Sequence, residues 1–170
     1  MKIIFKQIIS ILLISTILGI FNNYFISKNS VDLIKYQRVV NTVLEGDFSI
    51  PDLMTEPQIV KTDFIKHYID NPNTIIIDAR DKEQYDELHI KGSINIPYNS
   101  YENSDILYEL PVENVYIIYC NGGDCTLSLD LAYVLFDEFD FEAVFVYEEG
   151  IPVWESKGYL LSSNIDDTMD

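Results

Sequence analysis

The chain has 170 residues, 48% of them hydrophobic and 13% aromatic, which is enough for one well-formed core. Eleven Lys and Arg stand against 28 Asp and Glu, so the net charge is −17. Because Lys2, Lys6 and Lys28 are the only charged residues among the first 30, residues 31–170 carry a net charge of −20. A surface this acidic repels phosphate backbones, which argues against nucleic-acid binding, and it also repels small anions.

Residues 1–27 have the pattern of a transmembrane anchor or a signal segment. Lys2 and Lys6 precede an uncharged run, Gln7–Ser27, whose apolar centre is Ile8–Phe21. This centre is short for a full bilayer crossing, whereas cleavage requires small residues that the segment largely lacks. We favour an uncleaved anchor and keep the cleaved signal as the alternative. Either way the positive end stays in the cytoplasm, which predicts a periplasmic or extracellular domain, secreted if the segment is cleaved.

Residues 28–55 are polar and interrupted by Gly and Pro, which predicts a connecting stalk with one helix near Val31–Leu44. From residue 56 to 162, short apolar runs alternate with stretches of helical periodicity. The predicted strands are Gln58–Val60, Thr74–Asp78, Ser93–Ile96, Val115–Tyr119 and Ala143–Tyr147. The predicted helices are Thr62–Tyr68, Asp81–Leu88 and Thr126–Phe139. Residues 163–170 form an acidic tail.

The three longest predicted strands are apolar throughout rather than alternating, which is typical of parallel strands covered on both faces. Alternation of such strands with helices over about 110 residues predicts an α/β domain with a mainly parallel central sheet flanked by helices. In this architecture ligands bind beyond the carboxyl ends of the strands. A functional site is therefore expected at those ends.

One strand end carries a cysteine. Val115–Tyr119 is followed by the loop Cys120-Asn121-Gly122-Gly123-Asp124-Cys125, which leads into the predicted helix at Thr126. The glycines permit backbone conformations that point peptide N–H groups inward, and the helix N-terminus adds more N–H donors. Such an environment favours a thiolate at Cys120 and would hold an anion bound to it. This chemistry requires no metal, cofactor or side-chain base.

Three segments together resemble the rhodanese-like domain family. They are Asp78–Pro97, which contains Asp-Ala-Arg and His-Ile-Lys-Gly-Ser-Ile-Asn-Ile-Pro; Tyr119–Gly123; and Gly150–Trp154, with the pattern Gly-x-x-x-Trp. The resemblance covers residues 56 to 161 and implies an α/β sandwich that transfers sulfur through a persulfide on Cys120. It also implies a substrate-binding loop formed by Asn121, Gly122, Gly123, Asp124, Cys125 and Thr126.

The loop departs from the family's pattern in two places. Asp124 stands where members that use thiosulfate often carry a basic residue, and Cys125 stands where many carry Arg or Thr. A like charge about 6 Å away costs on the order of 1–3 kcal/mol, so a persulfide or polysulfide donor is favoured over thiosulfate. The expected acceptor is a thiol or a cyanide-type nucleophile. The six-residue loop also lacks the length and closing Arg that the family's phosphatase relatives require.

Cys125 leaves three interpretations open, because both cysteines of the chain lie in one loop. It attacks a persulfide on Cys120 and forms a disulfide; it forms a plain redox pair with Cys120; or it fills the helix start as a small apolar residue.

A sulfurtransferase is the leading hypothesis for the function of the chain. A non-catalytic module that binds an unknown protein partner and a dithiol redox protein are the alternatives.

The remaining candidates are structural. We expect Asp78 and Arg80 to brace the fold, His89 to be hydrogen-bonded rather than catalytic, and Trp154 to lie in the core. His67 is expected on an exposed helix face. The spacing of the two His and two Cys residues matches no zinc-binding pattern.

Overall fold

The computed structural model describes residues 2–25 and 40–165. Its centre is a five-stranded, fully parallel sheet in the order β1-β6-β5-β2-β4. The strands are β1 (Gln58–Val60), β2 (Thr74–Asp78), β4 (Ile94–Asn95), β5 (Val115–Tyr119) and β6 (Ala143–Tyr147). The α/β fold with a mainly parallel sheet is confirmed, and four of the five predicted strands have the predicted bounds; only Ser93–Ile96 shortens, to β4.

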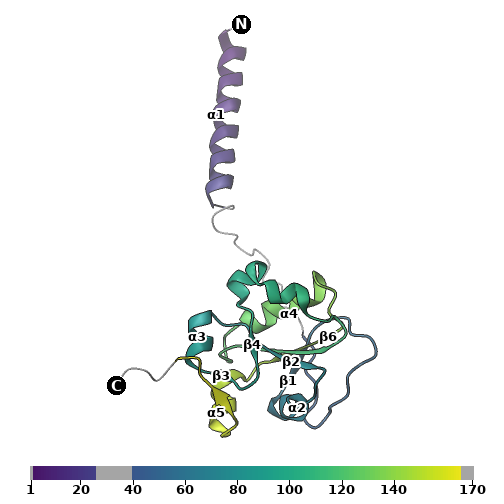
Figure 1. The fold of residues 1–170 in the computed structure, drawn as a ribbon. Coiled ribbons are helices and arrows are strands. Elements are labelled where there is room, and N and C mark those ends of the chain that lie inside the picture. The colour runs from purple at the N-terminus through teal and green to yellow at the C-terminus, as the bar shows by residue number, and fades with distance from the viewer. Residues whose placement is uncertain (1, 26–39, 166–170) are drawn as a thin grey trace, which may run out of the picture. The chain divides into compact units, whose positions relative to one another are not determined.

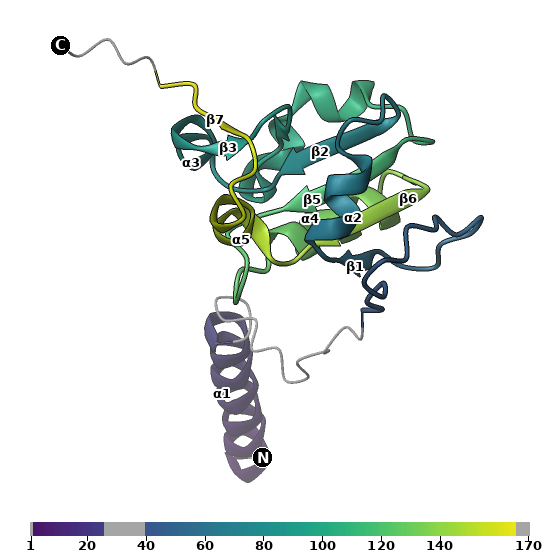
Figure 2. The same cartoon turned by 90° about the horizontal axis from the view of Figure 1, so that it is seen from below.

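Helices cover both faces of this sheet (Figure 1). One face carries α2 (Thr62–Tyr68) and α5 (Gly150–Ser156), and the other carries α4 (Leu127–Asp137). Two short 3-10 helices, η1 (Tyr98–Asn103) and η2 (Asp105–Glu109), lie on the α4 side. Helix α3 (Lys82–Glu87) precedes a small antiparallel pair, β3 (His89–Ile90) with β7 (Leu161–Ser162), visible in Figure 2.

The two-sided cover explains why β5 and β6 are apolar throughout and why β2 is apolar at its three middle positions. In β5, Ile117 and Tyr119 pack against α2 and α5, whereas Tyr116 and Ile118 pack in the core beneath α4. All four are fully buried. Because successive side chains of a strand point to opposite faces, a strand covered on both faces has no position left for a solvated polar residue. The sequence pattern therefore reported the layer architecture correctly.

Part of the expected stalk packs against the domain. Thr42 pairs in parallel with Ile59 of β1, and Val43 N–H donates to the carbonyl of Ile59 at 2.8 Å. Met54 is buried in the core, and the carbonyl of Phe48 accepts a hydrogen bond from Tyr68. Residues 40–44 are not helical, so the predicted helix Val31–Leu44 is wrong at its described end, while residues 31–39 lie outside the described residues.

The N-terminal segment forms helix α1 (Lys2–Phe25). Within the two described ranges, no helix is both long enough and apolar enough to cross a membrane. The transmembrane anchor expected in residues 1–27 is therefore not supported. Polar Asn22 and Asn23 and charged Lys2 and Lys6 confine the apolar part of the helix to its centre. The acidic residues 166–170 of the predicted tail lie outside the described residues.

Candidate functional site

Cys120 follows the last residue of β5 at the carboxyl edge of the sheet. Its five preceding residues form the central strand, paired in parallel with β2 and β6. The loop that begins at Cys120 ends where α4 starts at Leu127, one residue after the predicted Thr126. Cys120 is only 1% exposed. The sheet therefore fixes the position of this sulfur in the interior, directly below the loop.

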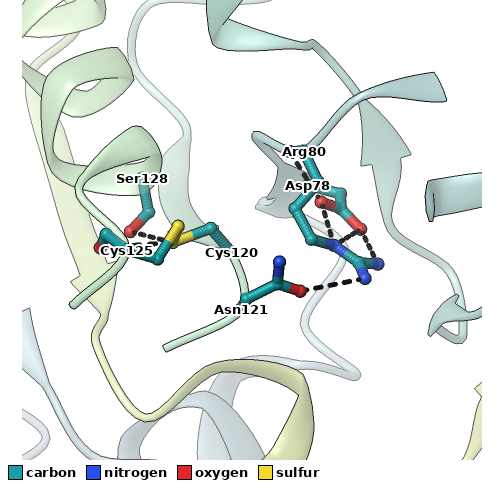
Figure 3. The surroundings of a disulfide bond; sticks show 6 residues. All are labelled: Asp78, Arg80, Cys120, Asn121, Cys125 and Ser128. Atoms are coloured by element: carbon teal, nitrogen blue, oxygen red, sulfur yellow. Dashed lines mark hydrogen bonds and ion pairs between the residues drawn. A yellow bond between two sulfur atoms is a disulfide. The ribbon is translucent and has the colours of Figure 1, made fainter. Parts of the chain in front are cut away.

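Cys120 and Cys125 form a disulfide bond across the loop (Figure 3). Their Cα atoms are 6.6 Å apart, within the range that a disulfide spans. Cys125 is therefore more than an apolar residue at the helix start. Of the three sequence interpretations, the two that give Cys125 a redox role agree with this geometry.

Ser128, in the first turn of α4, lies beside the disulfide. Its hydroxyl oxygen is 3.3 Å from Sγ of Cys120, and the residue is buried. In the oxidised protein the hydroxyl is the donor, because a disulfide sulfur carries no hydrogen. Sequence reasoning missed this residue. The available signal was a serine in a nearly all-apolar helix, three positions after Cys125.

Two glycines hold the loop against the segment that follows β6. Gly122 and Gly150 both have positive φ, 73° and 63°. A Cβ at Gly150 would lie 2.5 Å from the carbonyl oxygen of Cys120, and a Cβ at Gly122 would clash with the carbonyl of Glu149. Ile151 N–H donates to that same Cys120 carbonyl at 3.2 Å. The two loops are thus joined by main chain alone, at a spacing that only glycine permits.

A buried ion pair supports the other side of the loop. Arg80 Nε and Nη2 donate to the carboxylate of Asp78, at distances down to 2.6 Å, and both residues are buried. Burial lowers the pKa of Arg80, but the hydrogen bonds and charge of Asp78 outweigh it, and the net shift is upward. Arg80 Nη1 also donates to Asn121 Oδ1 at 3.4 Å (Figure 3). The Asn121 side chain therefore points at Arg80, away from the disulfide.

Tyr119, the last residue of β5 and the one before Cys120, has a structural role. Its hydroxyl accepts a hydrogen bond from Ile90 N–H at 3.0 Å and lies 3.0 Å from Ser93 Oγ. Burial and the nearby Asp78 carboxylate raise its pKa far above the ordinary value, so the phenol stays protonated at neutral pH. It cannot act as a base for the cysteine.

The expected structural roles of the histidines and the tryptophan agree with their contacts. His89 is buried, stacks on Tyr85 and lies 2.7 Å from the Tyr85 carbonyl through Nδ1. His67 is exposed, with its ring stacked on Phe48. Trp154 is 1% exposed and donates to the Leu160 carbonyl. None of the three contacts the disulfide.

A cavity of about 280 Å³ opens beside the loop. Its wall is formed by residues 123–126, by Ser128 and Leu129 of α4, and by Ile59, Val146 and Glu148 from the sheet and its edge. The lining thus includes Cys125 but not the buried Cys120. It contains two carboxylates, Asp124 and Glu148, and no Lys or Arg. Lys61 forms an ion pair with Glu148 at 3.7 Å.

The predicted loop residues therefore have different positions. Gly123, Asp124, Cys125 and Thr126 line the cavity, whereas Gly122 packs on the Glu149 backbone and Asn121 on Arg80. Cys125 N–H donates to the Gly122 carbonyl at 3.2 Å, so this amide closes a turn within the loop. Glu148 and Ile59 were not predicted, because they are far from the loop in sequence.

A family model described as the rhodanese-like domain matches residues 61–157. Among curated proteins, the tRNA uridine(34) hydroxylase of Yersinia enterocolitica is 29% identical over 97 residues, covering 54% of this chain and 27% of the hydroxylase. An adenylyltransferase and sulfurtransferase of Ogataea parapolymorpha is 39% identical over 55 residues, and the match covers 32% of this chain and 14% of that protein. This chain thus spans less than a third of either relative.

Among solved structures, the BH2092 protein from Bacillus halodurans superposes with a TM-score of 0.55 at 28% identity. The match covers 65% of this chain and 80% of that protein. This likeness agrees with the α/β fold described above.

Proposed function

We propose that this chain, which belongs to the rhodanese-like domain family, transfers sulfane sulfur through a persulfide on Cys120. The observation that carries the proposal is the position of Cys120: at the carboxyl end of the central strand, beneath a loop fixed by Gly150, with a hydroxyl donor 3.3 Å from its sulfur. Thiolates and persulfides are stabilised by such donors, and parallel sheets bind ligands at this edge.

In the reduced protein, the Cys120 thiolate attacks the outer sulfur of a donor R–S–S⁻. The Cys120–sulfur bond forms as the donor's sulfur–sulfur bond breaks, and R–S⁻ leaves with the electron pair. An acceptor thiol or cyanide then attacks the outer sulfur and regenerates the Cys120 thiolate. The two cavity carboxylates disfavour thiosulfate, a dianion, more strongly than a singly charged persulfide R–S–S⁻, which supports a persulfide as the donor.

Mass spectrometry of the intact chain tests the proposal. The reduced protein, treated with polysulfide, is expected to gain about 32 Da per added sulfur on Cys120. The variant Cys125→Ser should keep this adduct and Cys120→Ser should lose it. Thiocyanate formation from cyanide should likewise be kept in Cys125→Ser and lost in Cys120→Ser. An adduct on Cys125 alone, or none with any donor, would refute the proposal and leave the protein-binding module as the better account.

The disulfide favours a second candidate, a dithiol route. Cys125 Sγ attacks the inner sulfur of a Cys120 persulfide, the Cys120–Cys125 bond forms, and HS⁻ leaves with the outer sulfur. The sulfane sulfur is reduced and the two thiols are oxidised, so the step balances without another reactant. This route predicts sulfide release and a loss of about 2 Da from the dithiol, only when both cysteines are present.

Location outside the cytoplasm stays a prediction from the lysines that precede the apolar part of α1. Fractionation of cells that express the full chain tests it. Protease added to the outside of intact cells should cleave the domain. Recovery of a protected domain in the cytoplasmic fraction would contradict the prediction without affecting the chemistry proposed for Cys120.

A further inference from the structure

The two sulfurs of the disulfide are not equally accessible. Cys120 is 1% exposed and is absent from the wall of the loop cavity, whereas Cys125 is partly exposed and lines that cavity. A thiolate that opens a disulfide must reach one sulfur along the line of the sulfur–sulfur bond. From the cavity, the sulfur within reach is that of Cys125.

The arrangement also distinguishes the two leaving groups. If Cys125 is attacked, Cys120 leaves as a thiolate with the Ser128 hydroxyl 3.3 Å from its sulfur. Among the described residues, no side-chain hydrogen-bond donor contacts Sγ of Cys125. A stabilised thiolate is the better leaving group, so the preference set by access and the preference set by leaving-group stability point to the same sulfur.

The charge of the cavity restricts the thiol that enters. Asp124 belongs to the loop itself, and Glu148 follows β6 at the opposite wall. Lys61 lies 3.7 Å from Glu148 and 4.0 Å from Glu149, so this cation is shared between two carboxylates. Ile59, Leu129 and Val146 supply the apolar part of the wall. The cavity thus disfavours anions and suits a compact thiol that is uncharged or cationic.

We propose that this cavity is the entry site for such a thiol, which opens the disulfide at Cys125 and releases Cys120. The entering thiolate R–S⁻ bonds to Cys125 Sγ, the Cys120–Cys125 bond breaks, and Cys120 takes the electron pair. A second R–S⁻ then attacks the mixed disulfide, giving R–S–S–R and a Cys125 thiolate. The two electrons come from the two thiols, whose protons pass to solvent.

This inference rests on the proposed function in one respect: the released Cys120 is the thiolate that accepts sulfur. The disulfide form is then the resting state of the site, and the thiol that enters the cavity converts it into the active state. Which sulfur is attacked is nevertheless a property of the disulfide alone. It is measured without any sulfur transfer, so the two proposals can fail separately.

The first test identifies the attacked sulfur. The oxidised full chain is mixed briefly with cysteamine and quenched with N-ethylmaleimide, which alkylates the freed thiol before it attacks back. Cleavage before Asp124 by a protease specific for Asp places the two cysteines on separate peptides. We expect cysteamine on Cys125 and maleimide on Cys120. Cysteamine on Cys120, an even distribution, or an oxidised chain without the disulfide overturns the inference.

The second test measures charge selectivity. Reduction rates with cysteamine, 2-mercaptoethanol and 3-mercaptopropionate are compared per thiolate present, each relative to its rate on bis(2-hydroxyethyl) disulfide. The expected order is cationic, neutral, anionic, with about tenfold between the extremes at low salt. Asp124→Asn with Glu148→Gln should remove most of this difference. Equal relative rates for the three thiols in the natural chain would overturn the assigned selectivity.

A matched control separates local from global charge. Glu83 and Glu87 are exposed residues of α3 that do not line the cavity. Glu83→Gln with Glu87→Gln removes the same net charge, and the tenfold range should persist. If this pair reduces the range as strongly as the cavity pair, the selectivity belongs to the overall charge of −17 and the assignment to the cavity is wrong.

Discussion

Gly122 and Gly150 pack main chain against main chain, each in a left-handed conformation, and so join the cysteine loop to the start of α5. A Cβ at Gly150 would lie 2.5 Å from both the Cys120 carbonyl oxygen and the Gly122 nitrogen. Neither neighbour is a flexible side chain that can move aside. The position of the reactive sulfur therefore depends on a glycine 30 residues away in the sequence.

Gly150→Ala should destabilise the fold and displace the loop. The left-handed conformation costs about 1–2 kcal/mol for a residue with a Cβ, and the clash adds to this cost. Gly158→Ala is the control, because Gly158 has φ 71° but open space around it. Urea unfolding should show a larger loss of unfolding free energy for Gly150→Ala, with slower persulfide formation. Equal losses for the two variants would show that the close approach has no energetic effect.

Ser128→Ala should weaken the thiolate at Cys120. A hydrogen bond to a charged group contributes about 1.5–3 kcal/mol, so its loss should move the titration of the reduced thiol to higher pH. At a pH below the midpoint this lowers the thiolate fraction and the alkylation rate by about tenfold. The measurement is the pH dependence of iodoacetamide alkylation in Cys125→Ser, with and without Ser128→Ala. Ser156→Ala, at an exposed serine of α5, should leave the profile unchanged.

Arg80→Met should cost about 3–5 kcal/mol of unfolding free energy, because it leaves the fully buried Asp78 carboxylate without its partner. Lys82→Met breaks the exposed ion pair with Asp86 and should cost less than about 1 kcal/mol. Denaturant unfolding of both variants provides the comparison. Similar small costs would mean that the Asp78–Arg80 pair does not stabilise the fold as its burial implies.

The domain should unfold in alkali through its buried tyrosines. Burial raises the pKa of Tyr116 and of Tyr147 to about 12 each, above the ordinary value of 10.0. Because the folded values are the higher ones, this contribution to stability is complete below pH 10 and is lost as the pH rises toward 12. Tyrosinate absorbance should therefore appear together with loss of circular dichroism. Tyr147→Phe, which cannot ionise, should shift the alkaline midpoint upward; full titration at ordinary pH with the fold intact would contradict the pKa assignment.

The fold was largely predictable because its signal is local. Runs such as Val115–Tyr119 and Ala143–Tyr147 are apolar at every position, and only a strand covered on both faces tolerates that. The position of Cys120 followed from the same signal, since it comes directly after such a strand. Helix ends were predicted less closely: the helix predicted to begin at Thr126 begins at Leu127 in the structure. The turns at helix ends fray and their hydrogen bonding varies, so the sequence signal for the first residue is weak.

The sequence by itself determined the layer order, the cysteine at the carboxyl edge of the sheet and the acidic character of the loop. Only the tertiary structure decided what surrounds that cysteine. Parallel pairing sets Tyr119 opposite Tyr147, so the residues that follow, Cys120 and Glu148, emerge at the same edge of the sheet. Which residues meet there depends on strand order and register, and these are set by the packing of the whole core rather than by any short stretch of sequence.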